Sequence, residues 1–578
     1  MTTLSPPTEA HLSPNSSKEA MEGSSSRPAS QISSSSSHDL ANTFNPDWRF
    51  VVAFSSLSII TLMAALDATS ISVALPIMAR VLNGTAIEAF WAGTSFLLTS
   101  TVSQPVLANF SNIFGRKPLI FFSLTLFGVG AIVAAVANDF ATILVGRSIQ
   151  GIGGGGVIVM TEIVATDLVP LRERGKWFGF ISSMWALGTV AGPLLGGGFA
   201  QNISWTWIFW INLPFIGIGT AMIILFLKLN YQTSSFIAKL KRVDWIGSVV
   251  FVGATTGFLI PITWGGVMYP WDSWRTLVPL VLCSAALIAF VFYEGWLQKN
   301  GHEPVLRLSV MNNVTANVTF LTTFVHGIIL WSILYYLPLY YEAVKGFSPI
   351  LAGVALFPQT FTVAPASVIA GIVIAVTGKY TWFTWGGWAV TTLGMGLMLL
   401  LDVDTSTPAW IFINLVPGIG TGVLFSAMAI TVQASASNED QAHAVTSFAL
   451  FRALGQTVGV AVGGTIFQNQ MKKKLLTYPL LADKATEYSR DASGLVQIIK
   501  EMPEGLAKAQ LKLAYVDAAR YIWIFCCALA GAALIASLWT KALPLDREHE
   551  TKQGFKHTAK HIDEEAKVID DGKDTHAA

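Results

Sequence analysis

Residues 58–79 read SIITLMAALDATSISVALPIMA, an apolar run that is long enough to cross a lipid bilayer. The run contains one carboxylate, Asp67, which is the only charged side chain between Arg49 and Arg80. A charge at the centre of a bilayer costs about 2.5 to 3.5 kcal/mol on insertion scales, so an acid placed there is expected to face a partner or a polar cavity. The stretch therefore predicts a transmembrane helix with a candidate functional residue inside it.

The composition of the whole chain is typical of a membrane protein. Of its 578 residues, 52% are hydrophobic and 12% are charged, whereas about a quarter of the residues of a soluble protein are charged. The net charge of +1 argues against a nucleic-acid partner, which would require a concentrated basic face. The three cysteines lack the spacing of a zinc site or a disulfide framework, and we expect no metal and no cofactor.

The apolar runs predict about fourteen transmembrane helices by the length criterion. We place them at residues 50–76, 88–110, 118–138, 141–164, 177–199, 207–227, 246–265, 277–297, 316–338, 350–376, 381–401, 408–432, 446–468 and 519–540. The serine-rich segment 1–47 and the charged segment 542–578 are expected to be cytoplasmic tails, the first of them disordered. Segment 470–518 is expected to form a long outer loop.

Basic residues predict the topology, because cytoplasmic connectors carry an excess of lysine and arginine. With the N-terminus inside, the outer short connectors hold only Arg80, Arg275 and Lys345. The inner ones hold Arg116, Lys117, Arg172, Arg174, Lys176, Lys228, Lys239, Lys241, Arg242, Lys299, Arg307 and Lys379. Two sequons, which begin at Asn83 and Asn202, then lie outside and are candidate glycosylation sites.

Besides Asp67, three ionisable side chains lie well inside predicted helices: Arg147, His326 and Arg452. Arg147 belongs to the stretch LVGRSIQGIGGGG, in which Gln150 shares its helical face. Asp67 and Arg147 can be interpreted as a titrating or substrate-binding site in a polar cavity, or as a structural ion pair. His326 is either a proton carrier or a hydrogen-bonding residue of the helix packing.

Two predicted helices carry a glycine at every fourth position. The positions are Gly188, Gly192 and Gly196, with Pro193 among them, and Gly455, Gly459 and Gly463. Such stripes let helix backbones approach closely. They are explained either by static packing or by a sliding or rocking interface between two helical bundles.

A set of motifs in a fixed order resembles the major facilitator superfamily, in particular its fourteen-helix drug:proton antiporter branch as found in fungi. The resemblance covers about residues 48–541. The motifs are ALDATSISVALP, FGRKPL, GRSIQGIGGGG, DLVPLRERGKWFG, GTVAGPLLGG, SWTWIFWINLP, RVDWIGS, YYLPLYYEAVKGFSP and FRALGQTVGVAVGG.

The resemblance implies an all-α membrane protein of the major-facilitator fold that works by alternating access. Two six-helix bundles would span 48–230 and 306–541, with two additional helices in 231–305. It also implies that Asp67 and Arg147 line the central cavity and take part in proton coupling or substrate binding. The glycine-proline motif around Pro193 resembles the antiporter motif, which is associated with export.

The connector after the second helix resembles the gating loop of the family, with Gly115, Arg116 and Lys117 in FGRKPL. Where the family has an aspartate, this chain has Asn112. In the family that aspartate latches onto an arginine whose position here is taken by Arg452.

A latch between Asn112 and Arg452 would be neutral on one side. An amide-guanidinium hydrogen bond is weaker than a charge-assisted pair, so we expect the outward-facing state to be held less strongly. Glu162 or Asp167 would still be available to Arg116.

The sequence thus predicts a proton-coupled exporter of small amphipathic organic compounds such as drugs, toxins or secondary metabolites. Protonation of Asp67 would remove the charge that pairs with Arg147 or binds substrate. The alternative is a transporter of the same fold that imports a metal chelate or carries basic amino acids into the vacuole. An enzyme is not expected, because the few intramembrane ionisable groups form no catalytic cluster. We expect a monomer in the plasma membrane, with the vacuolar membrane as the alternative.

Overall fold

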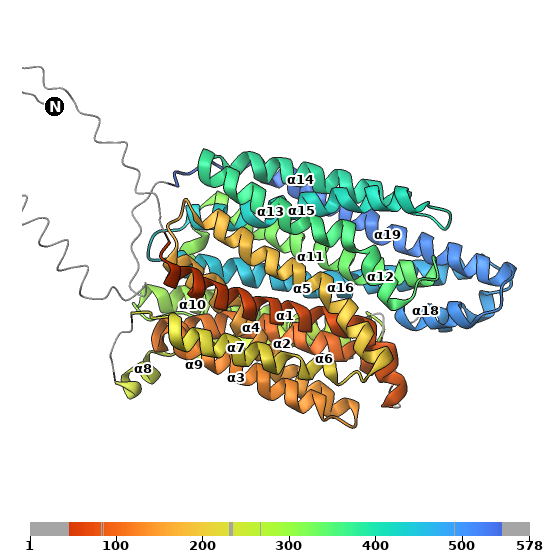
Figure 1. Cartoon of the computed structure of the whole chain (residues 1–578), viewed down its shortest axis with the longest axis horizontal. Coiled ribbons are helices and arrows are strands. Elements are labelled where there is room, and N and C mark those ends of the chain that lie inside the picture. Colours follow the sequence, from red (N-terminus) through yellow and green to blue (C-terminus); the bar gives the residue numbers. More distant parts are fainter. Residues whose placement is uncertain are drawn as a thin grey trace, which may run out of the picture. The chain divides into compact units, whose positions relative to one another are not determined.

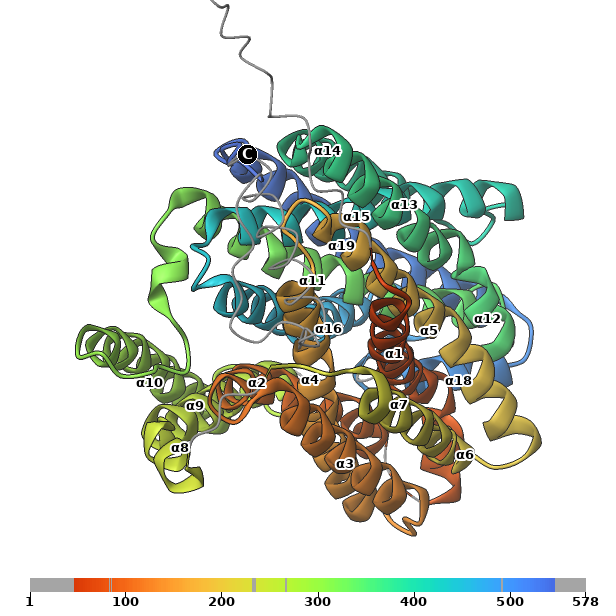
Figure 2. The same cartoon turned by 60° about the vertical axis from the view of Figure 1, so that its left-hand side comes forward.

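The computed structural model describes residues 46–545, apart from 83, 85, 231–234, 266–267 and 490–491. The two expected tails therefore lie almost wholly outside the described residues. Within the described residues the chain is helical and forms no strand. Figures 1 and 2 show the helices running side by side along one direction.

The long helices are α1 (Trp48–Val81), α2 (Ala86–Phe114), α3 (Arg116–Ala135), α4 (Phe140–Leu168), α5 (Arg174–Asn202), α7 (Asn212–Phe226), α9 (Trp245–Trp264), α10 (Trp274–Lys299), α11 (Val314–Ala343), α13 (Phe357–Thr377), α14 (Tyr380–Leu397), α15 (Thr407–Ser435), α16 (Gln441–Leu475) and α19 (Leu506–Ser537). The short helices are α6 (Trp207–Trp210), α8 (Phe236–Arg242), α12 (Pro349–Ala355), α17 (Ala485–Tyr488) and α18 (Ala492–Glu501).

Thirteen helical stretches of the described chain are long and apolar enough to cross a membrane. The predicted all-α membrane fold is therefore confirmed. Helix α2 is not among the thirteen, although it has 29 residues. It carries a buried polar row that includes Thr101, Ser103 and Gln104, and it packs against α4 and α16. A polar helix that is covered by other helices needs less apolar surface than one that faces lipid.

The helices pack in two groups that follow the chain order. Helices α1–α5 and α7 contact one another and form what we call the N-half, and α11, α13–α16 and α19 form the C-half. Figure 2 shows the N-half below, in red to yellow, and the C-half above, in green to blue. The halves meet where α5 packs on α13 and where α2 and α4 pack on α16. Helices α9 and α10 form a pair that contacts α2 and α16.

One end of this bundle holds most of the basic connector residues, and we call it the basic end. Helix α1 begins there and α2 ends there. The positive-inside rule predicts that this end faces the cytoplasm.

Segment 470–518 differs from the long loop that was expected. Helix α16 continues to Leu475 and α19 begins at Leu506, and α18 lies between them. The charged stretch 472–474, which was expected in the loop, forms the last turn of α16, and Lys474 pairs there with Asp517 of α19 at 2.9 Å. Helix α18 buries Leu495, Val496 and Ile499 and packs against α11, α16 and α19. The segment is therefore largely helical.

The glycine stripes lie inside the two halves and not between them. A methyl group built on Gly192 would lie 2.1 Å from Oγ1 of Thr69 in α1, and one on Gly196 would lie 2.1 Å from a carbonyl oxygen of α1. In the C-half, a methyl group on Gly455 would lie 2.1 Å from the carbonyl oxygen of Phe324 in α11. The sliding-interface interpretation of these stripes is wrong, and static packing within each half explains them.

Other glycines make the close contact between the halves. At the basic end, a methyl group on Gly371 of α13 would lie 2.1 Å from the carbonyl oxygen of Gly175 in α5. One turn further, a methyl group on Gly179 would lie 2.9 Å from the Cα of Val368. The α5 and α13 backbones therefore touch directly at this end.

Candidate functional site

Asp67 lies inside α1 and is 1% exposed. Its Oδ2 accepts a hydrogen bond from Nη1 of Arg147 at 2.5 Å. Its Oδ1 accepts from Nε2 of Gln150 at 2.7 Å and from Nδ2 of Asn212 at 2.9 Å. Arg147 also donates to Oε1 of Gln150 at 2.7 Å and to the carbonyl oxygen of Ala92 at 3.1 Å. The buried negative charge of Asp67 is therefore compensated by the positive charge of Arg147 and by hydrogen bonds to both carboxylate oxygens.

The structure brings the three predicted residues Asp67, Arg147 and Gln150 together from α1 and α4. It adds Asn212, the first residue of α7, which the sequence reasoning did not single out. The only signal in the sequence was an amide within SWTWIFWINLP, a motif that was used for the resemblance alone.

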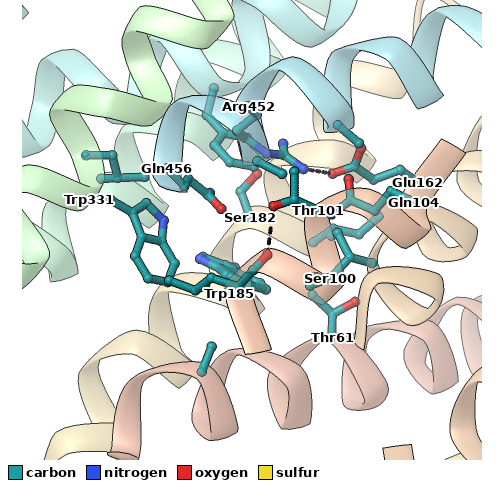
Figure 3. A pocket seen from close by; sticks show the side chains of 18 of the residues that line it. Thr61, Ser100, Thr101, Gln104, Glu162, Ser182, Trp185, Trp331, Arg452 and Gln456 are labelled. Atoms are coloured by element: carbon teal, nitrogen blue, oxygen red, sulfur yellow. Dashed lines mark hydrogen bonds and ion pairs between the residues drawn. The ribbon is translucent and has the colours of Figure 1, made fainter. Parts of the chain in front are cut away.

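A cavity with a volume of about 40 Å³ lies between the N-half and the C-half. Its apolar wall includes Phe96, Ile181, Trp185, Leu330, Trp331 and Phe425. Its polar wall includes Thr101, Gln104, Glu162, Ser182, Arg452 and Gln456. Figure 3 shows polar side chains from both halves pointing into this space. The volume has room for water but not for an organic compound, so this cavity holds no cargo in the described conformation.

Asp67 and Arg147 do not belong to the lining of this cavity in the described conformation. The expectation that they line it is therefore corrected. The reason is Phe96, which lines the cavity and lies against the Arg147 guanidinium, with 4.4 Å between the guanidinium carbon and the ring centre. Phe96 is thus the physical link between the buried ion pair and the cavity.

A second buried ion pair lies in the cavity wall itself. Nη2 of Arg452 in α16 donates to Oε1 of Glu162 in α4, and the two residues are 6% and 4% exposed. The Arg452 guanidinium carbon lies 4.8 Å from the ring centre of Phe425 and 5.1 Å from that of Phe448. This pair joins the N-half to the C-half. The sequence reasoning placed Glu162 near the end of its helix, but α4 continues to residue 168 and Glu162 is buried.

Several buried polar atoms of the cavity wall have no hydrogen-bond partner within the part of the chain that the structure describes. They are Nη1 of Arg452, Oε2 of Glu162, Oε1 of Gln104 and Nε1 of Trp331. Buried polar atoms are nearly always hydrogen-bonded in folded proteins. Water or a polar ligand in the cavity would satisfy these four atoms.

The gating loop is held by Arg116, the first residue of α3. Its Nε donates to Oδ2 of Asp167 at 2.9 Å, and its Nη1 donates to Oδ1 of Asn112 at 2.6 Å. Of the two acids considered for Arg116, Asp167 is the observed partner. Gly115 has a φ of 101°, which favours glycine. Lys117 donates to the carbonyl oxygen of Leu227 at 3.0 Å, after the end of α7.

The expected latch between Asn112 and Arg452 is absent from the described structure. Nδ2 of Asn112 lies 3.5 Å from Nε2 of His443, in the first turn of α16. Arg452 lies more than two helical turns further along α16 and pairs with Glu162. The latch expectation is therefore wrong, because the position assigned to the family's arginine is too deep in the membrane for Asn112 to reach.

Polar contacts close the basic end between the halves. Nη1 of Arg174 in α5 donates to Oε1 of Gln433 at 2.9 Å and to Oε1 of Gln441 at 2.6 Å. Arg172 donates to the carbonyl oxygen of Ala375 in α13 at 3.0 Å. In the sequence these two arginines indicate only the topology, whereas in the structure both join the N-half to the C-half at the basic end.

His326 is 1% exposed and belongs to the C-half. Its Nε2 lies 3.0 Å from the carbonyl oxygen of Thr421 in α15, and His326 is not among the cavity-lining residues. This position favours the packing interpretation over a proton carrier in contact with substrate. No group of three or more potential metal ligands is found in the described residues.

Of the two sequons, only Asn202 can be located. It is the last residue of α5, is exposed, and donates to the carbonyl oxygen of Gly198 at 3.0 Å. Asn83 lies outside the described residues.

Comparison with known proteins agrees with this architecture. The family model described as Major Facilitator Superfamily matches residues 57–460. MFS transporter L2 of Phoma sp. is 63% identical over 553 residues, which cover 95% of this chain and 91% of the relative. Efflux pump FUS6 of Gibberella fujikuroi is 36% identical over 519 residues, which cover 88% of this chain and 92% of the relative.

Among solved structures, the proton:xylose symporter XylE has the same fold. It superimposes with a TM-score of 0.52 at 14% identity, over 86% of this chain and 97% of that one. At this level of identity the likeness concerns the fold alone.

Proposed function

The chain belongs to the major facilitator superfamily, and from this premise we propose that it exports small amphipathic organic compounds by alternating access, in exchange for protons. The family and the fold indicate a transporter rather than an enzyme. Export is supported by relatives that are named efflux pumps and that match most of the chain, such as FUS6. The proposed compounds are drugs, toxins or secondary metabolites.

The observation that carries the proposal is the cavity between the halves. Its wall combines large apolar rings with a buried ion pair and amides, which suits a ligand that is apolar over most of its surface and polar at one end. Because helices of both halves supply the wall, a movement of one half against the other would change both the volume of the cavity and the side to which it opens.

In this mechanism the basic end must open to admit a compound from the cytoplasm. The contacts that would have to break are those of Arg174 with Gln433 and Gln441 and the direct backbone contact of Gly175 with Gly371. The Glu162–Arg452 pair would separate as well, since its partners belong to different halves. Closing the basic end again would restore these contacts and turn the cavity toward the opposite side.

Proton coupling is assigned to Asp67. Protonation would remove the charge that Arg147 compensates, and the guanidinium would lose its strongest hydrogen bond. Phe96 lies against Arg147 and in the cavity wall, so a shift of the guanidinium would reach the cavity through that ring. An entering proton also gains about 2.3 kcal/mol for each 100 mV of membrane potential.

The proposal is tested by measuring how much of each compound in a broad amphipathic panel cells retain, with and without the full-length chain. Cells that produce the chain should retain less of at least one compound. Increased retention would favour import, as in the metal-chelate alternative, and unchanged retention across the panel would contradict transport of this class.

We further propose that the protein is located in the plasma membrane and is a monomer. Fluorescence of a C-terminally tagged chain should outline the cell, and a signal from the vacuolar membrane instead would support sequestration. The purified chain in detergent should have the mass of one copy by light scattering, and a larger protein mass would contradict the monomer.

A further inference from the structure

Arg452 places a fixed positive charge in the cavity wall. We propose that the transported compound is an organic acid whose carboxylate takes the place of Glu162 on Arg452. This inference rests on the export function proposed above and names the chemical class of its cargo.

The first argument is the set of free donors on the C-half side of the cavity. Nη1 of Arg452 and Nε1 of Trp331 have no partner within the described chain, and the two residues are 6% and 3% exposed. Figure 3 shows the side chain of Gln456 between them. Guanidinium and indole groups donate hydrogen bonds and cannot accept them. This wall therefore fits a ligand group made of acceptors, such as a carboxylate.

The second argument is the charge balance when the halves separate. Of the residues that line the cavity, Glu162 and Arg452 carry charges, and they lie on opposite halves. A guanidinium does not lose its proton in a protein, so opening would leave Arg452 charged in a largely apolar wall without its partner. A carboxylate on the cargo would restore that partner, with the two-pronged geometry that arginine and carboxylates share.

The third argument weighs against the other cargo classes. A basic cargo could pair with Glu162 only beside an arginine whose charge is permanent, and like charges repel in a poorly solvated cavity. A neutral ester could accept a hydrogen bond but would leave the guanidinium charge uncompensated. Oε1 of Gln104, on the N-half side, has no partner among the described residues and could accept from a hydroxyl of the same cargo. The apolar body would lie against rings such as those of Phe96 and Phe425.

The test uses sealed inside-out membrane vesicles from cells that produce the full-length chain, in which export appears as accumulation. The probes are sets of three compounds with one apolar body, such as 1-pyrenebutyric acid, its methyl ester and 1-pyrenebutylamine, with further sets built on naphthalene and long alkyl chains. At least one acid should accumulate, and its ester and amine should accumulate about tenfold less or not at all.

Variants then identify the residue that holds the acid. Arg452→Gln should lower accumulation of the acid about tenfold or more. Arg452→Lys should lower it less, because lysine keeps the positive charge but lacks the two parallel N–H donors of the guanidinium. Trp331→Phe keeps the ring but removes the donor, so it should weaken accumulation several-fold even if Arg452→Gln does not fold. Glu162→Gln removes the carboxylate that competes for Arg452, so in vesicles that contain equal amounts of protein it should lower accumulation of the acid less than Arg452→Gln does. Lys473→Gln, an exposed change on the same helix, is the control.

The outcomes separate this inference from the export function itself. Accumulation of esters or amines as strong as that of the acids contradicts the acid cargo and leaves export in place. If Glu162→Gln lowers accumulation of the acid as much as Arg452→Gln does, the ion pair has a purely structural role, and this outcome also contradicts the inference. If no probe of any class accumulates above the level of control vesicles, the export function fails as well.

Discussion

At the scale of single residues, two buried ion pairs differ in what surrounds them. Both oxygens of Asp67 are bonded, by Arg147, Gln150 and Asn212, although Nη2 of Arg147 has no partner within the described chain. In the Glu162–Arg452 pair the acid too has an unpartnered oxygen within the described chain. A carboxylate with both oxygens bonded keeps its buried charge at lower cost than one with a free oxygen. We therefore propose the first pair for proton coupling and the second for binding of cargo.

The first prediction concerns stability. Asp67→Asn leaves Arg147 charged and buried without a counter-charge, so it should lower the free energy of unfolding by about 3 to 5 kcal/mol. The double variant Asp67→Asn with Arg147→Gln removes both charges and should recover most of that loss. Thermal unfolding of the purified variants in detergent measures both effects. Equal stability of the single variant and the wild type would show that Arg147 does not depend on Asp67.

The second prediction separates coupling from folding. In the double variant, which carries no titratable group at this site, an imposed pH gradient should no longer accelerate transport, although transport down a cargo gradient should continue. The assay compares the initial rates with and without the gradient in vesicles that contain equal amounts of protein. A double variant that still responds to the pH gradient would remove Asp67 from the coupling mechanism.

The sequence could identify Asp67, Arg147 and Gln150, because a charge in an apolar run is costly and a helical period assigns residues to one face. It could not identify Asn212 as the further partner, since an amide near the start of a helix is common and carries no such cost. It could not show that Phe96 separates this pair from the cavity. That fact depends on how α2 and α4 pack, which one sequence does not determine.

At the scale of helices, the contact between α5 and α13 closes the basic end. The carbonyl oxygen of Gly175 and the Cα of Gly371 approach so closely that a methyl group on either residue would collide with the other helix. Because the colliding atoms belong to the backbone, they cannot move aside as a flexible side chain can. The contact therefore requires glycine at both positions.

The third prediction uses this contact. Gly371→Ala should hold the basic end open, because its methyl group would lie 2.1 Å from the Gly175 oxygen. A cysteine introduced at Ser182 in the cavity wall should then react faster with a membrane-impermeant thiol reagent added from the cytoplasmic side. Gly198→Ala is the matched control on α5, since no atom of the described chain lies within 4 Å of the added methyl group. Labelling equal to that of the control would argue against a gate at this contact.

Helix boundaries show where prediction from the sequence ends. Apolar length predicts the membrane helices well, but charged residues do not mark where these helices end. Glu162 is buried inside α4, and α16 extends to Leu475. Charges inside or beyond a span are tolerated where they find partners, as Glu162 does with Arg452 and Lys474 does with Asp517. Such partners come from distant parts of the chain and cannot be read from local composition.

At the scale of the whole molecule, the cavity that holds the Glu162–Arg452 pair lies between the two halves, and polar contacts join the halves at the basic end. The order of motifs was enough to predict the fold, because each motif occurs at its place along the chain. The lining of the cavity could not be predicted, because it depends on which helix faces converge. The proposed exchange of a cargo for a proton would involve both ion pairs and the gate.

Proton movement during cargo efflux tests this central claim most directly. The purified chain is reconstituted into liposomes that contain a pH-sensitive dye and a cargo identified by the retention assay, with no initial pH gradient. As cargo leaves, the lumen should acidify, and neither liposomes without protein nor those with the Asp67→Asn, Arg147→Gln double variant should show this change. Efflux of cargo from wild-type liposomes without acidification, or with a rise in lumen pH, would contradict proton exchange.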